Sequence, residues 1–339
     1  MNKRKKKIKI NIKWWKIILI IILVYLYLGS VQYSRTITNY KYDLVIIIKD
    51  LNIFERNRDY YKKFLNYDKI VVISPLNTKN MIKDDNSVLF ISEDSIIPKQ
   101  KINEFLRKMR SISTKRDCWY EQQFLKMAYS RICKSEYYLI WDGDTIPIKY
   151  IQMFENGKPF FDMKTEHHVP YFKTMNSLIP GLKFADKSYI SEHMLIKTQF
   201  MKNLLDRLES NTKLSGKIFW EKILMAIDSK NIDFSGFSEY ETYGSYVDTI
   251  YPNFYVRRIW CSMREAKIFF DSPEKLSEND IKWLSKYYHA LTFEKYHRFK
   301  QKNLEIVKNK EIQEEYQPNE FFKNYDYIYR KYVNKNHKA

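Results

Sequence analysis

Two aspartates separated by one glycine, Asp142 and Asp144, have the residue type and spacing that best suit chemistry in this sequence. If the chain is still extended there, both side chains point the same way, because side chains alternate along a strand. Two carboxylates on one side suit a hard divalent cation, Mg²⁺ or Mn²⁺, that keeps other positions for phosphate oxygens. Gly143 between them lets a ligand approach closely. The pair predicts a phosphate-handling metal site, with a plain acidic turn as the alternative.

A helix and a strand precede this pair within residues 118–149. Residues at helical spacing predict the helix: Trp119, Gln122/Gln123, Lys126/Met127 and Ser130. Residues 137–141 are a short apolar and aromatic run, which predicts a buried strand. The two carboxylates therefore lie on a loop just after a strand.

Three further strands are predicted upstream, at residues 44–48, 69–73 and 88–91, with helices at 54–65 and 101–109. Strands that alternate with helices predict an α/β fold with a mostly parallel sheet of the Rossmann type. Ligands of such sheets bind beyond the carboxyl ends of the strands. The polar residues at these ends are therefore candidates for ligand binding: Lys49, Asp50, Ser74, Asp94, Asp142 and Asp144.

The second half of the chain has weaker patterns. Residues 154–162 and 171–185 contain proline and glycine breakers and are predicted to be irregular. Residues 190–196 predict a strand that carries Glu192 and His193, and residues 199–208 and 218–227 predict helices. A segment rich in Ser, Gly, Tyr and Glu follows at 234–252, and the tail after Phe293 is predicted to be helical, basic and aromatic.

Composition narrows the function classes. The 339 residues are 45% hydrophobic and 17% aromatic, enough for one large domain, and seven glycines leave no Gly-rich phosphate loop. The net charge of +19 is concentrated at the ends: residues 1–16 carry eight basic and no acidic side chains, and residues 295–339 carry eleven basic and six acidic ones. The remaining mild excess suits an anionic sugar-phosphate ligand better than nucleic acid. Three cysteines exclude a disulfide framework.

The N-terminus reads as a membrane anchor. Residues 1–16 are basic, residues 17–28 are uninterruptedly apolar, and tryptophans and tyrosines lie near the ends of this run. We predict a cytoplasmic tail at 1–16, a single-pass type II signal anchor at 17–33 and a linker at 34–41. A cleavable signal peptide is the alternative, because the run has the length of a signal-peptide core. The catalytic part would then face a Golgi-type lumen in a eukaryote, or lie at the inner membrane of a bacterium.

Three blocks of sequence, in this order, resemble a known class. They are residues 119–126 (WYEQQFLK), 142–145 (DGDT) and 238–244 (SEYETYG). The chain resembles GT-A-fold nucleotide-sugar glycosyltransferases of the DxD type. It is most similar to a little-characterised group of glycosyltransferases from bacteria and unicellular eukaryotes, over about residues 43–260. The resemblance implies a GT-A-like fold whose nucleotide-sugar-binding half spans 42–149 and whose acceptor half spans 150–294, followed by the tail at 295–339.

The resemblance also implies roles for the residues of the first two blocks. Asp142 would face the ribose or the metal, and Asp144 would bind the metal that bridges the diphosphate of a UDP- or GDP-sugar and so serve catalysis. Lys126 would neutralise a phosphate, with a surface lysine as the alternative. Gln122 and Gln123 would hold the nucleotide or cap the sheet.

The remaining implied roles concern the second half. Glu239 or Glu241 would act as general base on the acceptor hydroxyl or orient the acceptor, unless the segment is an exposed acidic loop. His193 would contact the donor sugar, with a buried core histidine as the alternative. His289 is the nearest candidate for a third metal ligand, although the residues around it do not match such motifs.

The predicted function is a metal-dependent, hexosyltransferase-like enzyme that moves a sugar from a nucleotide sugar to a glycan, lipid-linked or protein acceptor. One alternative is a phosphatase of the haloacid-dehalogenase type, which uses a DxD after the first strand of its core domain. The other alternative is a non-catalytic, membrane-anchored binding or scaffold protein whose basic tail contacts anionic lipid. The sequence does not identify the oligomeric state.

Overall fold

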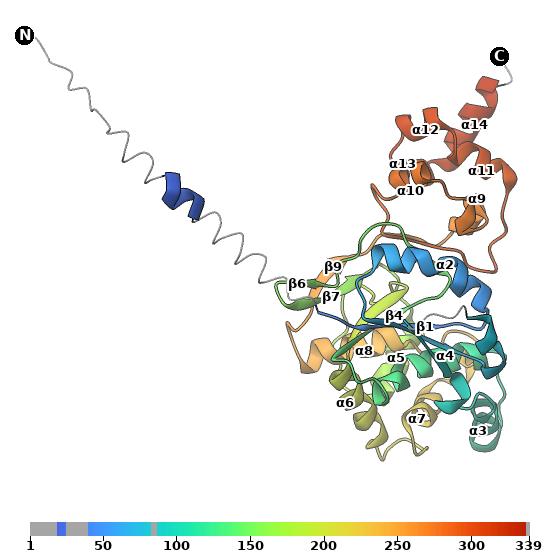
Figure 1. Cartoon of the computed structure of the whole chain (residues 1–339). Coiled ribbons are helices and arrows are strands. Elements are labelled where there is room, and N and C mark those ends of the chain that lie inside the picture. The colour runs from blue at the N-terminus through green and yellow to red at the C-terminus, as the bar shows by residue number, and fades with distance from the viewer. Residues whose placement is uncertain (1–18, 25–39, 83–86, 337–339) are drawn as a thin grey trace, which may run out of the picture.

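The computed structural model describes residues 19–24, 40–82 and 87–336 (Figure 1). Its centre is a five-stranded sheet in the order β3-β2-β1-β4-β8, in which β1 to β4 run parallel and β8 is antiparallel to β4. The strands are β1 (Asp43–Ile47), β2 (Lys69–Ser74), β3 (Val88–Ser92), β4 (Tyr137–Trp141) and β8 (His193–Lys197). The mixed α/β class with a mostly parallel sheet is therefore confirmed.

Helices cover both faces of this sheet, which explains why its central strands are continuous apolar runs. Successive side chains of β1 enter opposite cores: Val45 and Ile47 pack on one side, Leu44 and Ile46 on the other. Helix α2 covers one face, and a group of helices covers the other (Figure 1). These helices are α2 (Leu51–Phe64), α3 (Gln100–Arg110), α4 (Asp117–Ala128), α6 (Thr198–Glu209), α7 (Phe219–Ala226) and α8 (Glu239–Ile250).

The strand order reverses between β1 and β4. The chain builds β1, β2 and β3 outward in one direction and then returns to place β4 on the other side of β1. The carboxyl ends of β1 and β4 therefore lie side by side at the point where the strand order reverses. Open α/β sheets bind ligands at such a switch point.

Two segments predicted to be irregular are ordered by partners far away in sequence. Residues 154–162 form a hairpin in which β6 pairs with β7. Strand β7 also pairs in parallel with β9, which makes a small three-stranded sheet. Residues 171–178 belong to a helix. The elements are β6 (Phe154–Glu155), β7 (Lys158–Met163), β9 (Val256–Ile259) and α5 (Val169–Leu178).

The C-terminal part forms its own core with a third small sheet, β10-β11-β5. Ile146 and Ile148 pack there against side chains from residues 263–328, so the predicted division at 294 falls inside one hydrophobic cluster. The described part of the tail is helical, as predicted, and groups with α9 and α10 (Figure 1). The elements are β5 (Thr145–Pro147), β10 (Ser262–Met263), α9 (Ala266–Phe270), α10 (Glu278–Leu284), β11 (Ala290–Thr292), α11 (Gln301–Val307), α12 (Lys310–Glu315), α13 (Pro318–Lys323) and α14 (Tyr325–Asn336).

Most of the predicted N-terminal anchor lies outside the described residues. Of the segment 17–33 the structure describes only residues 19–24, and of the linker 34–41 only residues 40 and 41. The basic tail at 1–16 is not described at all. Within the part of the chain that is described, no helix combines the length and apolar character that crossing a membrane requires.

Candidate functional site

The two aspartates lie on a tight turn that directly follows β4. The backbone N–H of Asp142 donates to the carbonyl of Glu192 (2.9 Å), and the N–H of Thr145 donates back to the carbonyl of Asp142 (3.0 Å). The chain is therefore no longer extended at the pair, and strand alternation does not set the direction of the side chains. Burial, followed by the charge of Asp142, raises the pKa of Asp144.

Helix α2 holds this turn from one face of the sheet. The Asn57 side chain donates to the Gly143 carbonyl (2.9 Å), and the Tyr61 hydroxyl contacts the carbonyls of Gly143 (3.2 Å) and Thr145 (3.3 Å). Asn57 and Tyr61 are four residues apart and so share a helix face. A Cβ on Gly143 would lie 2.6 Å from Cδ1 of Ile48, so the glycine makes room for Ile48 rather than for a ligand.

Lys126 of α4 is buried and lies between two carboxylates. Its Nζ is 2.8 Å from Oδ1 of Asp142, 2.7 Å from Oε1 of Glu239 and 3.1 Å from the hydroxyl of Tyr240. Burial alone would lower the pKa of Lys126, but the carboxylates of Asp142 and Glu239 raise it well above its ordinary value. The structure therefore joins all three predicted sequence blocks at one point, and Lys126 is not a surface lysine.

The SEYETYG block begins helix α8 and is not an exposed loop. The Ser238 hydroxyl accepts from the N–H of Glu241 (3.3 Å), as an N-cap residue does. The side-chain carbonyl of Gln123 accepts from the N–H of Glu239 (3.2 Å), so Gln123 serves this helix start. The Gln122 amide donates to the carbonyl of Ile47 at the end of β1 (3.4 Å). Both glutamines therefore fasten the elements that carry the site.

The two glutamates of this block point to different partners, because residues two apart on a helix do not share a face. Glu239 faces Lys126. The Glu241 carboxylate accepts from the hydroxyl of Ser188 and from the N–H of Tyr189 (3.3 Å), and burial raises its pKa to about 7. The structure thus brings Glu239 to the aspartate pair and directs Glu241 into packing against the segment before β8.

Asp144 has an excess of negative charge around it. Its pKa is raised to about 7, first by burial and then by the carboxylates of Asp142 and Glu294. Glu294 follows Phe293, whose N–H donates to the carbonyl of Asp144 (2.9 Å), and its carboxylate pairs with Arg264 (2.9 Å). Sequence analysis missed Glu294, because only the pairing of β5 with β11 brings it near the aspartates.

The donor set of this turn fits a hard cation that takes its other ligands from a bound phosphate. Within residues 19–24, 40–82 and 87–336, no three His, Cys, Asp or Glu side chains converge on a point that would hold a metal ion. Mg²⁺ is commonly held by one or two carboxylates together with water and substrate phosphates. Asp142 and Asp144 could supply two such oxygens, and burial followed by the charges of Asp142 and Glu294 raises the pKa of Asp144.

A second polar cluster lies at the carboxyl end of β1. The Lys49 ammonium donates to Oε2 of the buried Glu121 (3.1 Å), whereas Oε1 of Glu121 has no hydrogen-bond partner in the part of the chain described. Burial, followed by the charge of Glu93, raises the pKa of Glu121 to about 7. The predicted position of Lys49 at the switch point therefore holds, and its partner Glu121 comes from the WYEQQFLK block.

Two of the residues predicted at strand ends have structural roles instead. The Asp50 carboxylate accepts from the N–H of Asn52 (3.1 Å) and caps α2. Ser74 is fully buried, and its hydroxyl lies 2.9 Å from that of Thr78. Local hydrogen bonds thus explain both, and we no longer assign them to donor binding.

His193 is a core residue rather than a contact for a donor sugar. Its side chain is 2% exposed, and Nε2 lies 2.9 Å from Oδ2 of Asp162. The ring packs between Trp141 and Trp260, with centroid distances of 4.8 and 4.3 Å. Because both its polar atoms and its faces are already occupied, the geometry favours the buried alternative over the donor-sugar role.

His289 does not lie at the metal site predicted for it. The backbone carbonyl of His289 accepts from the N–H of Ile148, at one end of the β5–β11 ladder. The carbonyl of Asp144 accepts from the N–H of Phe293 at the other end. His289 and Phe293 are four residues apart along the strand, which is roughly 13 Å. Nδ1 of His289 accepts from the N–H of Cys261 (3.2 Å), and the ring stacks on Trp260. Burial lowers its pKa to about 4. We therefore remove His289 from the candidate ligands.

The sheet and the turn at its switch point define a mixed α/β protein. Its acidic site is formed by side chains from three segments that are distant in sequence, 119–126, 142–145 and 238–244. A family model described as a family of unknown function (DUF6492) matches residues 45–314. The chain belongs to this family. The match includes the central sheet, the turn at 142–145 and helix α8. No curated protein matches the chain.

Proposed function

We propose that this protein is a metal-dependent glycosyltransferase with a GT-A-like fold, which uses a UDP- or GDP-sugar as donor and a glycan or glycoconjugate as acceptor. The observation that supports it is the position of Asp142 and Asp144. They follow β4 at the point where strand order reverses, beside the end of β1, and Lys126 joins Asp142 to Glu239. This is where α/β sheets bind nucleotides.

Different residues have different proposed roles in binding a diphosphate. Asp142 and Asp144 would supply oxygen ligands to one divalent cation, which would act as a Lewis acid toward the charge that develops on the leaving group. Glu239 is a positioning residue, because its carboxylate fixes the Lys126 ammonium beside Asp142. Lys49 stands at the end of β1, partly exposed and directed by Glu121, where a nucleotide would pass.

The position of the motif in the sheet separates this proposal from a phosphatase of the haloacid-dehalogenase type. That class carries its aspartates after the first strand of its core domain, whereas here three parallel strands precede β4.

The test is release of nucleoside diphosphate from a panel of UDP- and GDP-sugars, with Mn²⁺ or with EDTA. We expect Mn²⁺-dependent release that falls at least about 100-fold in Asp144→Asn, because the variant loses a carboxylate ligand of the cation that would stabilise the charge on the leaving group. Asp59→Asn, which changes an exposed acid on α2, is the control and should keep full activity. Circular dichroism should show both variants folded.

Two results would contradict the proposal. One is hydrolysis of p-nitrophenyl phosphate without any release from a sugar nucleotide, which would indicate a phosphatase. The other is full activity, or an unchanged cellular role, in Asp144→Asn, which would favour a binding or scaffold protein.

A further inference from the structure

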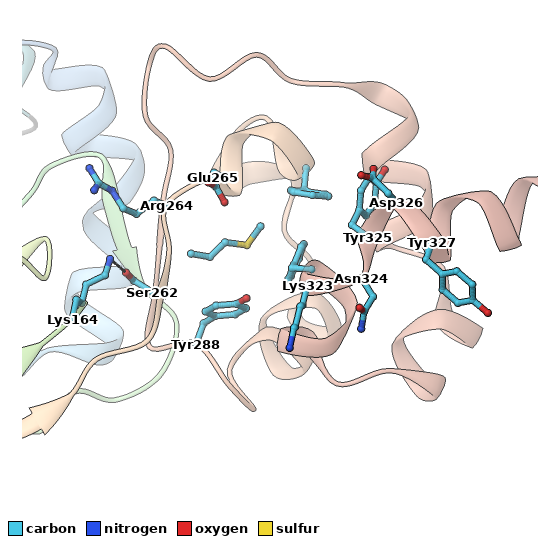
Figure 2. A pocket seen from close by; sticks show the side chains of 13 residues that line it. Lys164, Ser262, Arg264, Glu265, Tyr288, Lys323, Asn324, Tyr325, Asp326 and Tyr327 are labelled. Atoms are coloured by element: carbon cyan, nitrogen blue, oxygen red, sulfur yellow. Dashed lines mark hydrogen bonds between the residues drawn. The ribbon is translucent and has the colours of Figure 1, made fainter. Parts of the chain in front are cut away.

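A cavity of about 680 Å³ separates the α/β part from the C-terminal helices (Figure 2). Its volume is within the range of ligand sites, about 300–1,000 Å³. One wall comes from residues of the α/β part and of the β10 strand, and the facing wall comes from the end of α13 and the start of α14. The lining residues are Lys164, Ser262, Met263, Arg264, Glu265, Phe269, Tyr288 and the six residues 322–327.

Two short chains of contacts link this cavity to the aspartate turn. Lys164 pairs with Glu192 (2.6 Å), and the carbonyl of Glu192 accepts from the N–H of Asp142. Arg264 pairs with Glu294, whose charge acts on Asp144. Glu192 has a φ of 62°, a conformation uncommon for residues other than glycine. Lys164 and Arg264 are thus each linked to the aspartate turn through one glutamate, Glu192 or Glu294.

The lining combines aromatic faces with hydrogen-bonding groups, as a saccharide with its apolar ring faces and hydroxyl edges requires. Figure 2 shows Tyr288 between Lys164 and Ser262 on one side and Lys323 and Asn324 on the other. The Tyr288 ring packs on Phe322, with centroids 6.0 Å apart, which fixes its position.

The two lysines of the lining are the groups that could bind an acidic ligand. Three of the lining residues are basic and two are acidic, and Arg264 is already paired with Glu166, Glu192 and Glu294. Lys164 uses two of its three ammonium hydrogens, on Glu192 and on Ser262. Lys323 is exposed and has no ion-pair partner among the residues that the structure describes, so it presents an uncompensated ammonium from the tail side. An anionic group between these walls would gain charge-assisted hydrogen bonds.

We propose that this cavity binds the acceptor and that the acceptor is a saccharide carrying a carboxylate or a phosphate group. The acceptor role rests on the proposed function, because it takes the neighbouring aspartate turn as the donor site. The proposal also places the tail at 295–339 in the acceptor site, where residues 322–327 form a wall, so that the acceptor is not held by residues 150–294 alone.

Calorimetric titration of the full chain tests the ligand without requiring turnover. Two acidic probes are used, each with an uncharged counterpart. The trisaccharide of galacturonic acid is compared with galactotriose, and mannose 6-phosphate is compared with mannose. We expect at least one acidic probe to bind better than its counterpart, and the pair that differs identifies carboxylate or phosphate. Lys323→Gln should weaken that acidic probe about tenfold and leave the uncharged one unchanged. Lys310→Gln, an exposed lysine of α12 outside the lining, is the control.

Equal binding of acidic and uncharged probes, or a Lys323→Gln variant that binds as wild type does, would overturn the proposal. The release of nucleoside diphosphate with water as acceptor is measured in parallel on the wild-type chain and on Lys310→Gln, because it reports on the donor site without a saccharide in the cavity. If the acidic saccharide binds through Lys323 and no sugar nucleotide is ever hydrolysed, the glycosyltransferase proposal and the acceptor role fail while the saccharide site stands.

Discussion

Two ionic clusters lie on either side of the β4–β8 pair, and their charges are balanced differently. In the interior cluster, Asp162 is held by Arg258 (2.6 and 2.8 Å) and by His193 (2.9 Å), and these partners lower its pKa to about 2 despite its burial. In the edge cluster, a single lysine, Lys126, serves both Asp142 and Glu239. The neighbouring Asp144 has a pKa raised to about 7.

The difference separates an ionic cluster that stabilises the fold from one that can bind a ligand. Every carboxylate oxygen of Asp162 meets a donor, so the interior cluster gains nothing from an added cation. The edge cluster has more carboxylates than cations, and such a shortage in a partly open place is typical of functional sites. The same residue type, aspartate, is therefore structural in one place and available in the other.

Replacing Asp162 should have the largest effect on stability. Asp162→Asn would leave Arg258 without its buried counter-charge, and breaking a buried pair in this way costs about 3–5 kcal/mol in the free energy of unfolding. Urea unfolding of the variant beside Asp59→Asn, the exposed control, measures the difference. A loss below about 1 kcal/mol would show that the pair of Asp162 with Arg258 does not stabilise the fold.

A smaller effect is expected from Lys126→Met, which leaves Asp142 and Glu239 facing each other without a cation. Asp142 is partly exposed, so solvent screens the repulsion and the loss in the presence of EDTA should be about 1–3 kcal/mol. Mn²⁺ should restore part of this loss, and it should raise the melting temperature of the variant more than that of wild type.

Lys310→Met is the matched control for the surface loss of a lysine. If Mn²⁺ stabilises Lys126→Met no more than it stabilises the control, the edge cluster does not accept a cation in place of the ammonium.

The smallest effect concerns pH and the buried Glu121, which Lys49 and Glu93 face. Its pKa is raised from 4.5 to about 7, so the folded protein holds this proton more tightly than the unfolded chain does. Its contribution to stability is complete below about pH 4.5 and is lost as the pH rises through about 7. Glu121→Gln cannot ionise, and its unfolding free energy should therefore fall less over this interval.

Urea unfolding of Glu121→Gln at several pH values across this interval, with Glu104→Gln as an exposed control, gives the comparison. Parallel pH profiles for Glu121→Gln and wild type would mean that Glu121 stays ionised in the folded protein.

Local patterns predicted the strands well and the histidines poorly. The runs at 69–73, 88–91 and 137–141 match β2, β3 and β4 almost residue for residue. For β2 and β4 the reason is that a strand covered on both faces is apolar throughout. The roles of His193 and His289 depended on Trp260, which lies far from His193 in sequence, contacts its ring and stacks on that of His289. No local signal in the sequence announces such a contact.

The acidic site was predicted in part for the same reason. The order of the three blocks located Asp142, Lys126 and Glu239, which the structure joins. Two features escaped prediction because they depend on backbone pairing across long separations. Glu294 reaches Asp144 through the β5–β11 ladder, and Glu241 turns away once its segment becomes a helix.

Through the pairing of β5 with β11, the C-terminal part of the chain supports the strand that follows the aspartate turn. Ile146 and Ile148 leave the aspartate turn and are buried at once under helices from the last quarter of the sequence. A fragment truncated at residue 294 would keep the β5–β11 ladder but lose Ile306, Val307, Ile312, Phe321 and Ile328 from this core. The packing against the strand that follows the aspartate turn would therefore be weaker, although every carboxylate proposed for donor binding is retained.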